Sequence, residues 1–218
     1  MLLALETATN ICSVAFCNED GDLWEKRTRE KAAHSEKLFL FIEELMNEHD
    51  FRIPDLSALL VSEGPGSYTG LRIGASAVKG LLFQTKVPLY GVNTLASFAF
   101  HAGSGEARGK IHSIIDARRK HVYHQSFQFS GTELIAADET EVLPIETFER
   151  MAEEGDMVVG TGISRLSEAI KATTVTCGPD SITAKSLITL YQSGLDRFFH
   201  RSPPRLFEPK YLTSSQTN

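Results

Sequence analysis

The residues best suited to phosphate or cation chemistry lie in two polar turns, one in each half of the sequence. The first turn carries Glu6, Thr7, Thr9 and Asn10, and the second carries Asp116. Carboxylates bind hard cations, and hydroxyl and amide groups can hydrogen-bond a phosphate. The same groups can instead satisfy the backbone of their own turn. We favour this structural role for the first turn and keep all five residues as candidates for nucleotide contact.

Two glycine-containing loops, each between a predicted strand and a predicted helix, are the other candidate phosphate sites. Gly-Pro-Gly occupies residues 64–66, and Gly-Thr-Gly occupies residues 160–162. Backbone N–H groups at the start of a helix can bind phosphate. Neither loop has the lysine and serine or threonine of a P-loop, and neither matches the Gly-x-Gly-x-x-Gly dinucleotide motif. For the first loop we favour tight packing, whereas Gly160 and Gly162 stay candidates for nucleotide contact.

Neither the cysteines nor the histidines have the spacing of a metal site. The three cysteines are Cys12, Cys17 and Cys177, and this odd number without ligand spacing argues against a disulfide framework and a zinc site. His121 and His124 lie three residues apart in a predicted strand, so we expect their side chains on opposite faces. We therefore predict no metal site, and we expect the cysteines to act as small core hydrophobes.

The composition is that of a folded chain without a membrane span. The 218 residues are 42% apolar, which is enough for a sizeable core in one domain or two small ones. No apolar run approaches the ~20 residues of a membrane helix, and the start lacks a basic signal-peptide region. We expect a cytoplasmic protein with no membrane contact. Because the formal charge is −6 and no basic patch is evident, we expect another subunit to hold any nucleic acid.

Hydrophobic periodicity predicts that both halves open with strand, polar turn and strand. The first half is predicted to contain strands 2–5, 11–17, 23–28, 56–61 and 87–92 and helices 32–50, 70–84 and 94–101. A glycine-rich break over 102–109 predicts two domains, residues 1–103 and 104–218. In the second half, a final helix over about 184–200 could pack back on the first lobe.

The order strand, glycine loop, helix, strand predicts an α/β fold with a partly parallel sheet. The repeated strand–turn–strand unit, with an acidic residue in each turn, resembles the actin/hexokinase class. In that class the two turns face each other and hold the phosphates and metal of ATP, and residues 160–162 here occupy the place of its adenosine-binding motif. We therefore predict an actin/hexokinase-like fold of two lobes, each with a mixed sheet flanked by helices, the second lobe being reduced.

A longer motif resembles a specific family. Residues 64–74 read Gly-Pro-Gly-Ser-Tyr-Thr-Gly-Leu-Arg-Ile-Gly, which resembles the signature of the TsaB (YeaZ) family. Four further segments resemble that family in order and spacing: residues 3–9, 34–38, 116–123 and 209–212. The resemblance covers essentially the whole chain, closely to about residue 100 and loosely over 130–200.

This resemblance implies a non-catalytic role in tRNA modification. It implies a subunit that supports threonylcarbamoylation of adenosine 37 in tRNA (t6A biosynthesis) and binds the catalytic transferase TsaD through helices of its first lobe. It also implies the ATPase TsaE as a partner, homodimers through the same helical face, and tRNA contact only through the complex. No intrinsic cofactor is implied, although ATP or ADP could lie at a subunit junction.

The catalytic relative TsaD carries a His-x-x-x-His pair on a helix, which holds a metal ion. In this chain the two corresponding positions are Thr94 and Phe98. Phenylalanine cannot ligate a metal, and one hydroxyl cannot replace two imidazoles. Glu6 also stands where actin-like ATPases, and commonly this family, have aspartate. We therefore predict no catalytic residues.

The predicted partner interface combines two helices. The helix over 35–46 is apolar on more than one side, and the helix over 70–80 carries small residues that would let another backbone approach closely. The predicted contact residues are His34, Leu38, Phe39, Ile42, Met46, Gly70, Leu71, Arg72, Ile73, Gly74 and Val78. Burial of the first helix within its own chain is an equally consistent interpretation.

Two alternative functions remain open. A free-standing ATPase or sugar-kinase-like enzyme of the same fold would depend on Glu6 and Asp116. A protease is the other alternative, but Ser67 lies outside any Gly-x-Ser-x-Gly motif, which argues against a serine hydrolase.

Overall fold

The computed structural model describes residues 1–30, 34–103 and 109–212. The chain divides into two compact units. Of the described residues, the first unit comprises Met1–Thr94 and Thr183–Lys210, and the second comprises Leu95–Ile182 with Tyr211 and Leu212. The first unit is therefore built from two separated segments, whereas the sequence predicted one continuous lobe over residues 1–103.

The first unit contains a mixed six-stranded sheet in the order β12-β5-β4-β1-β2-β3. Strands β1, β2 and β3 form the predicted antiparallel meander, β4 and β5 run parallel to β1, and β12 is antiparallel to β5. The strand bounds are β1 (Leu2–Glu6), β2 (Cys12–Cys17), β3 (Leu23–Thr28), β4 (Ala58–Gly64), β5 (Leu89–Asn93) and β12 (Phe199–Ser202).

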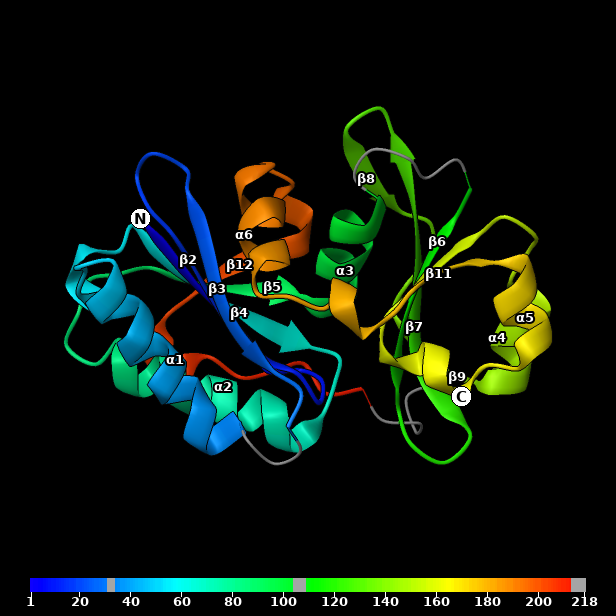
Figure 1. Ribbon diagram of the computed structural model, residues 1–218, viewed down its shortest axis with the longest axis horizontal. Coiled ribbons are helices and arrows are strands. Elements are labelled where there is room, and N and C mark those ends of the chain that lie inside the picture. The colour runs from blue at the N-terminus through cyan, green and yellow to red at the C-terminus, as the bar shows by residue number, and fades with distance from the viewer. Residues whose placement is uncertain (31–33, 104–108, 213–218) are drawn as a thin grey trace. The chain divides into compact units, whose positions relative to one another are not determined.

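Helices cover both faces of this sheet. Helices α1 (His34–Glu48) and α2 (Tyr68–Leu81) lie side by side on one face, and α6 (Lys185–Gln192) packs against β1, β2 and β4 on the other (Figure 1). Every residue of β1, β2 and β4 is buried, as expected for strands covered on two sides. The short 3₁₀ turns are η1 (Ile53–Asp55), η4 (Asp196–Phe198) and η5 (Pro204–Leu206).

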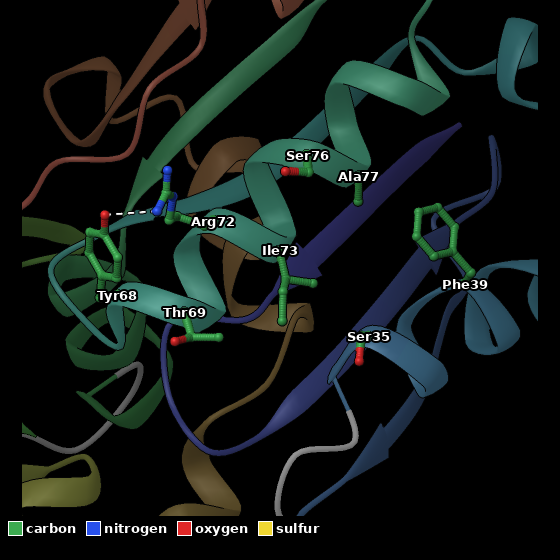
Figure 2. Close-up of a pocket in the computed structure, with 8 residues that line it drawn as sticks. All are labelled: Ser35, Phe39, Tyr68, Thr69, Arg72, Ile73, Ser76 and Ala77. Carbon is green, nitrogen blue, oxygen red and sulfur yellow. Dashed lines mark hydrogen bonds between the residues drawn. The ribbon is translucent and has the colours of Figure 1, made fainter.

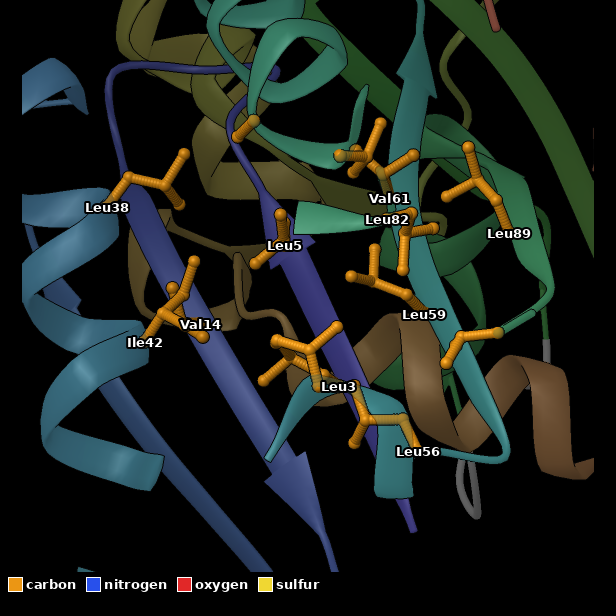
Figure 3. Close-up of a cluster of buried hydrophobic side chains, with 14 of the residues drawn as sticks. Leu3, Leu5, Val14, Leu38, Ile42, Leu56, Leu59, Val61, Leu82 and Leu89 are labelled. Atoms are coloured by element: carbon orange, nitrogen blue, oxygen red, sulfur yellow. The ribbon is translucent and has the colours of Figure 1, made fainter. Parts of the chain in front are cut away.

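The main hydrophobic core lies between this sheet and the pair α1 and α2. Figure 3 shows leucine, isoleucine and valine side chains from β1, β2 and β4 meeting side chains of α1. The labelled residues in that view are Leu3, Leu5, Val14, Leu38, Ile42, Leu56, Leu59, Val61, Leu82 and Leu89. This core fixes the orientation of both helices, and so determines which of their side chains stay exposed.

The second unit contains another mixed sheet, in the order β11-β10-β6-β7-β8 with β9 paired to β7. Its strands are β6 (Ile111–Asp116), β7 (His121–Ser130), β8 (Glu133–Ala136), β9 (Glu141–Pro144), β10 (Met157–Val159) and β11 (Val175–Cys177). Its helical segments are α3 (Thr94–Gly103, whose first residue groups with the other unit), α4 (Ile145–Met151), η2 (Thr161–Arg165), α5 (Glu168–Thr173) and η3 (Pro179–Ser181).

These two units confirm the predicted α/β fold of two lobes, each with a mixed sheet flanked by helices. Helices α4 and α5 have seven and six residues, compared with 15 and 14 in α1 and α2, so the second lobe is the reduced one. No helix in the part of the chain that the structure describes is long and apolar enough to cross a membrane.

The predicted final helix over about 184–200 is wrong in its C-terminal part. Helix α6 ends at Gln192, and Gly194 follows with a positive φ of 73°. A left-handed glycine commonly terminates a helix. The chain then returns as β12, which pairs with β5 at the edge of the first sheet. The packing of α6 on the first unit agrees with the expectation that this helix folds back.

Candidate partner-binding site

The glycines of α2 pack against their own chain. A Cβ atom added at Gly70 would overlap the carbonyl oxygen of Thr7, and one added at Gly74 would lie 2.5 Å from the Thr7 hydroxyl. A Cβ at Gly66 would overlap the Ala8 carbonyl in the same turn. The expectation that these small residues admit another molecule is therefore corrected, because the backbone that approaches them belongs to the β1–β2 turn.

Most of the predicted apolar contact residues belong to the core instead of the surface. The buried members of the predicted set are His34, Leu38, Ile42, Gly70, Leu71, Gly74 and Val78. Each helix needs one apolar stripe to cover the sheet, and these residues form or adjoin that stripe. For them, burial within the chain was the correct interpretation. Met46 and Ile73 are partly buried against the same core.

A groove between α1 and α2 remains on the surface. It has a volume of about 410 Å³, and Figure 2 shows its lining side chains: Ser35 and Phe39 from α1 and Tyr68, Thr69, Arg72, Ile73, Ser76 and Ala77 from α2. Phe39 is 49% exposed and Tyr68 is 57% exposed. The predicted residues Phe39, Arg72 and Ile73 therefore do meet at one surface site.

Five residues of the groove were not predicted from the sequence: Ser35, Tyr68, Thr69, Ser76 and Ala77. The sequence spacing could have indicated three groove positions together, because Tyr68, Arg72 and Ser76 are spaced four apart and so lie on one helical face. Their position follows from the start of α2, where the Ser67 hydroxyl accepts a hydrogen bond from Gly70 N at 3.3 Å.

Arg72 gives the groove a positive charge. Its Nη1 donates a hydrogen bond to the Tyr68 hydroxyl at 2.8 Å, and its guanidinium carbon lies 4.9 Å from the Tyr68 ring centroid. This pairing holds both side chains in place but leaves the charge unneutralised. Among the described residues, Arg72 forms no ion pair with a carboxylate. The groove therefore suits a partner surface with apolar side chains beside an acidic group.

The first candidate phosphate turn is closed by its own hydrogen bonds. Ala8 N donates to Glu6 Oε1 at 2.7 Å, and Ile11 N donates to Thr9 Oγ1 at 3.1 Å. Glu6, Thr7 and Thr9 are buried, and only Asn10 of the four predicted residues is exposed. Burial raises the pKa of Glu6 to about 8. Three of the four predicted residues are therefore enclosed within the first unit, and their contact with a nucleotide stays a prediction.

The carboxylate of the second candidate turn also accepts hydrogen bonds from its own chain. Asp116 Oδ1 accepts a hydrogen bond from Arg165 Nη1 at 2.7 Å and another from Arg118 N at 2.9 Å. A Cβ at Gly160 would overlap the Ile114 carbonyl, and one at Gly162 would lie 2.9 Å from the Ile114 side chain. Packing within the second unit therefore accounts for both glycines. The two turns belong to different units.

Thr94 and Phe98, the two positions that the resemblance matched to metal ligands of TsaD, both lie in α3. Thr94 is buried, and its hydroxyl accepts a hydrogen bond from Gly64 N at 3.0 Å. Phe98 is fully buried. The described residues contain no group of three or more histidine, cysteine, aspartate or glutamate side chains that could hold a metal ion.

A row of buried polar side chains in the second unit was not predicted. His112 Nδ1 lies 3.0 Å from His124 Nε2, and His112 Nε2 lies 3.0 Å from Asp156 Oδ2. On its other side, His124 Nδ1 lies 3.5 Å from Glu141 Oε1. The sequence predicted that His124 and His121 would face apart, but it could not show that β6 brings His112 beside His124. Burial, with a smaller contribution from His112 and opposed by Asp138, lowers the pKa of His124 to about 4.

Because of His124, we expect the second unit to become less stable as the pH falls. Between pH 6.5 and about 4, unfolded His124 binds a proton that the folded state excludes, so stability is present above pH 6.5 and is lost as pH falls. The loss should be about 3 kcal/mol across that window. Hydrogen exchange of β6 and β7 amides, corrected for intrinsic rates, measures it. A His124→Gln variant should flatten the dependence, whereas His121→Gln should not; equal dependence in all three proteins would contradict the assignment.

The comparisons with known proteins agree with this architecture. The family model described as tRNA N6-adenosine threonylcarbamoyltransferase (TsaD) matches residues 28–161. The tRNA threonylcarbamoyladenosine biosynthesis protein TsaB of Escherichia coli is 34% identical over 74% of this chain and 71% of its own length. Its Bacillus subtilis counterpart is 35% identical, and there the match spans 60% of this chain but only 56% of the relative.

A solved structure extends the similarity to nearly the whole chain. YeaZ from Pseudomonas aeruginosa superposes with a TM-score of 0.79 at 27% identity, covering 97% of this chain and 99% of YeaZ. The sequence match and the fold therefore agree over both units: the chain belongs to the TsaB (YeaZ) family.

Proposed function

We propose that this chain is a non-catalytic subunit in t6A biosynthesis that binds the transferase TsaD through the α1–α2 groove. Its curated relatives are named for threonylcarbamoyladenosine biosynthesis in tRNA, which supports the pathway. The observation that carries the proposal is the exposed pair Phe39 and Tyr68 beside the unneutralised Arg72.

The groove has the physical properties of a binding hot spot. Aromatic side chains and arginine supply most of the binding energy at protein interfaces. Burying an exposed phenylalanine contributes roughly 1.5–3 kcal/mol. The two helices are fixed by the core beneath them, so little ordering is required when a partner binds. A partner helix with apolar side chains and one carboxylate would complement the groove.

The test is the affinity of the purified chain for purified TsaD. A Phe39→Asp variant should weaken binding about 30-fold, the effect of a hot spot of ~2 kcal/mol, because a charge would be buried against the partner. Ser76→Arg, at an exposed position of the groove, should also weaken it. The matched control is Phe83→Asp, because Phe83 is 73% exposed but does not line the groove. Wild-type affinity in both groove variants would exclude this site.

Self-association is proposed through the same groove. A second copy and TsaD would then compete, so adding TsaD should convert a dimer of this chain into a heterodimer. TsaE is proposed to join the assembled pair, and tRNA is proposed to be held mainly by the complex. Size-exclusion chromatography with light scattering measures each step, and a ternary species with two copies of this chain in contact through α1 and α2 would argue against a shared groove.

We propose no intrinsic cofactor and keep ATP or ADP at a subunit junction as a separate proposal. The free-standing ATPase alternative is less well supported, because Glu6 is buried and Asp116 is ion-paired with Arg165. Calorimetric titration with ATP and magnesium, of the chain alone and with TsaD, distinguishes the free-standing ATPase from a nucleotide at a subunit junction. Tight binding with hydrolysis that is lost in Asp116→Asn would favour the enzyme, and binding only when TsaD is present would favour the junction.

A further inference from the structure

A second pocket lies on the first unit, away from the α1–α2 groove. It has a volume of about 580 Å³ and is lined by Tyr90, Tyr191, Gln192, Gly194, Asp196, Phe199 and Arg201. We call these residues the aromatic pocket. They come from β5, from α6 and the turn after it, and from β12 at the sheet edge. In the β5–β12 pairing Tyr90 stands directly opposite Arg201, so both side chains project from the same face.

Three aromatic rings form one wall of this pocket. The Tyr191 ring centroid lies 4.9 Å from those of Tyr90 and Phe199, with interplanar angles of 55° and 53°. Tyr90 and Phe199 are 5.9 Å apart, edge to face. Each ring is only half-buried, and their mutual contacts hold them in place. The wall is therefore a rigid apolar surface that a planar ligand could cover without ordering the protein.

Polar groups of both charges surround the rings. Burial, together with the hydrogen bond to the Tyr90 hydroxyl, raises the pKa of Tyr191 to about 12, so its hydroxyl stays protonated at neutral pH. Asp196 and Arg201 line the same pocket as the rings, so it contains both a carboxylate and a guanidinium group. Both side chains are exposed, and among the described residues neither forms an ion pair.

The surrounding segment is basic, although the chain as a whole is acidic. Residues 197–205 read Arg-Phe-Phe-His-Arg-Ser-Pro-Pro-Arg, with three arginines and no acidic residue, in a chain of formal charge −6. The arginines and His200 are all exposed. Although the whole chain has a net negative charge, this segment beside the aromatic rings is positively charged.

We propose that the aromatic pocket binds an unpaired nucleotide of an RNA, with the base against the Tyr191 and Phe199 rings and a phosphate at Arg201. Bases stack on aromatic side chains, and arginine neutralises the backbone, in proteins that bind single strands. Asp196 can accept a hydrogen bond from an exocyclic amino group, so cytosine, adenine and guanine fit better than uracil. An acidic peptide would use Arg201 but would gain nothing from the rings and would be repelled by Asp196. That the RNA is tRNA rests on the proposed function, whereas the nucleotide chemistry does not.

Binding to the full-length chain tests this proposal. The probes are a fluorescein-labelled ten-nucleotide single-stranded RNA of mixed sequence, the same RNA annealed to its complement, the four nucleoside monophosphates, and a hexaglutamate peptide. We expect the single strand to bind with a Kd on the order of 10⁻⁴ M at low salt, in the range of non-specific nucleic-acid binding, and the duplex to bind several-fold more weakly. CMP should bind more tightly than UMP.

Variants locate the contact. Tyr191→Leu should weaken RNA binding about 5- to 100-fold, the range for loss of one stacked base, whereas Tyr191→Phe should bind like wild type. Arg201→Glu, at an exposed position that leaves the fold intact, should weaken binding and lower the salt slope by about one or more. The matched controls are Tyr68→Leu and Lys79→Ala on the α1–α2 face, which should leave RNA binding unchanged.

Three outcomes would overturn the proposal. The first is that no RNA or nucleotide binds at millimolar protein, and the second is that Tyr191→Leu and Arg201→Glu both keep wild-type affinity. The third is that the peptide or the free nucleotides bind but the single-stranded RNA does not. Because Arg201 lies outside the α1–α2 groove, Arg201→Glu should keep wild-type affinity for TsaD. Loss of RNA binding and loss of TsaD binding are therefore separate failures.

Discussion

A Gly70→Ala variant is expected to unfold at a markedly lower urea concentration than the wild-type protein. The added Cβ would overlap the carbonyl oxygen of Thr7, which is backbone and cannot rotate away. Overpacking of this kind costs about 1–3 kcal/mol and occasionally more. Alanine gains up to ~1 kcal/mol of helix propensity over glycine, but that gain is smaller than the strain. Because the clash is with backbone, we expect the strain to lie in the upper half of that range and the net loss to be about 1–2 kcal/mol.

Gly80 provides a matched control in the same helix. It is exposed, and a Cβ added there would meet no atom within 4 Å. Gly80→Ala should therefore raise the free energy of unfolding by up to ~1 kcal/mol. The fluorescence of Trp24, the single tryptophan, reports on the first unit because this residue lies in β3 against Phe16 and His49. If both variants stabilised the protein equally, the close packing of α2 on the β1–β2 turn would be disproved.

The close packing of α2 on the β1–β2 turn also limits which variants can test partner binding. Substituting Gly70 or Gly74 would disturb the core of the first unit, so a loss of TsaD binding in such variants would not locate the interface. Exposed positions such as Phe39 and Ser76 avoid this problem, because neither side chain contributes to the core.

Replacing Glu6 with glutamine is expected to stabilise the protein at alkaline pH. The folded pKa of about 8 exceeds the ordinary value of 4.5, so the folded state retains a proton that the unfolded chain releases. Stability is therefore fully present below pH 4.5 and is lost as pH rises toward 8. At pH 7 the loss is about 3 kcal/mol. Glutamine keeps the oxygen that accepts from Ala8 N and removes the ionisation.

The measurement is the free energy of unfolding from Trp24 fluorescence in urea at pH 5 and pH 8. Wild-type stability of the first unit should fall between these values, and Glu6→Gln should remove most of that fall, gaining about 1–3 kcal/mol at pH 8. Glu63→Gln is the matched control, because Glu63 is also buried but pairs with Lys210 Nζ at 2.7 Å and His200 Nδ1 at 2.9 Å. That variant should not gain stability. A pH-independent gain in Glu6→Gln would show that ionisation is not the cause.

Several features of the fold follow from short-range patterns. Alternating and continuous apolar runs predicted the β1–β3 meander, β4 and β5, and helical spacing predicted α1 and α2. These predictions succeeded because strand and helix periodicity repeat within a few residues. The end of α6 was missed for the same local reason, since the apolar residues after Gly194 look helical until β5 provides a strand to pair with them.

The candidate site was predicted only in part. The sequence identified α1 and α2 but could not distinguish Phe39, which is exposed, from Leu38 and Ile42, which are buried. All three are apolar and adjacent on a helix that is apolar on more than one side. Which stripe faces the sheet depends on where β2 and β3 lie relative to α1, and that is a property of the packed fold.

By itself, then, the sequence determined the family and the α/β class, because these depend on residue identity and local spacing. The tertiary structure decided that Gly70 faces the Thr7 backbone, that Glu6 is buried, and that Tyr90 and Arg201 share one pocket. Those relations join segments far apart in the chain. Burial and contact depend on what the rest of the molecule places beside a residue, and no local pattern carries that information.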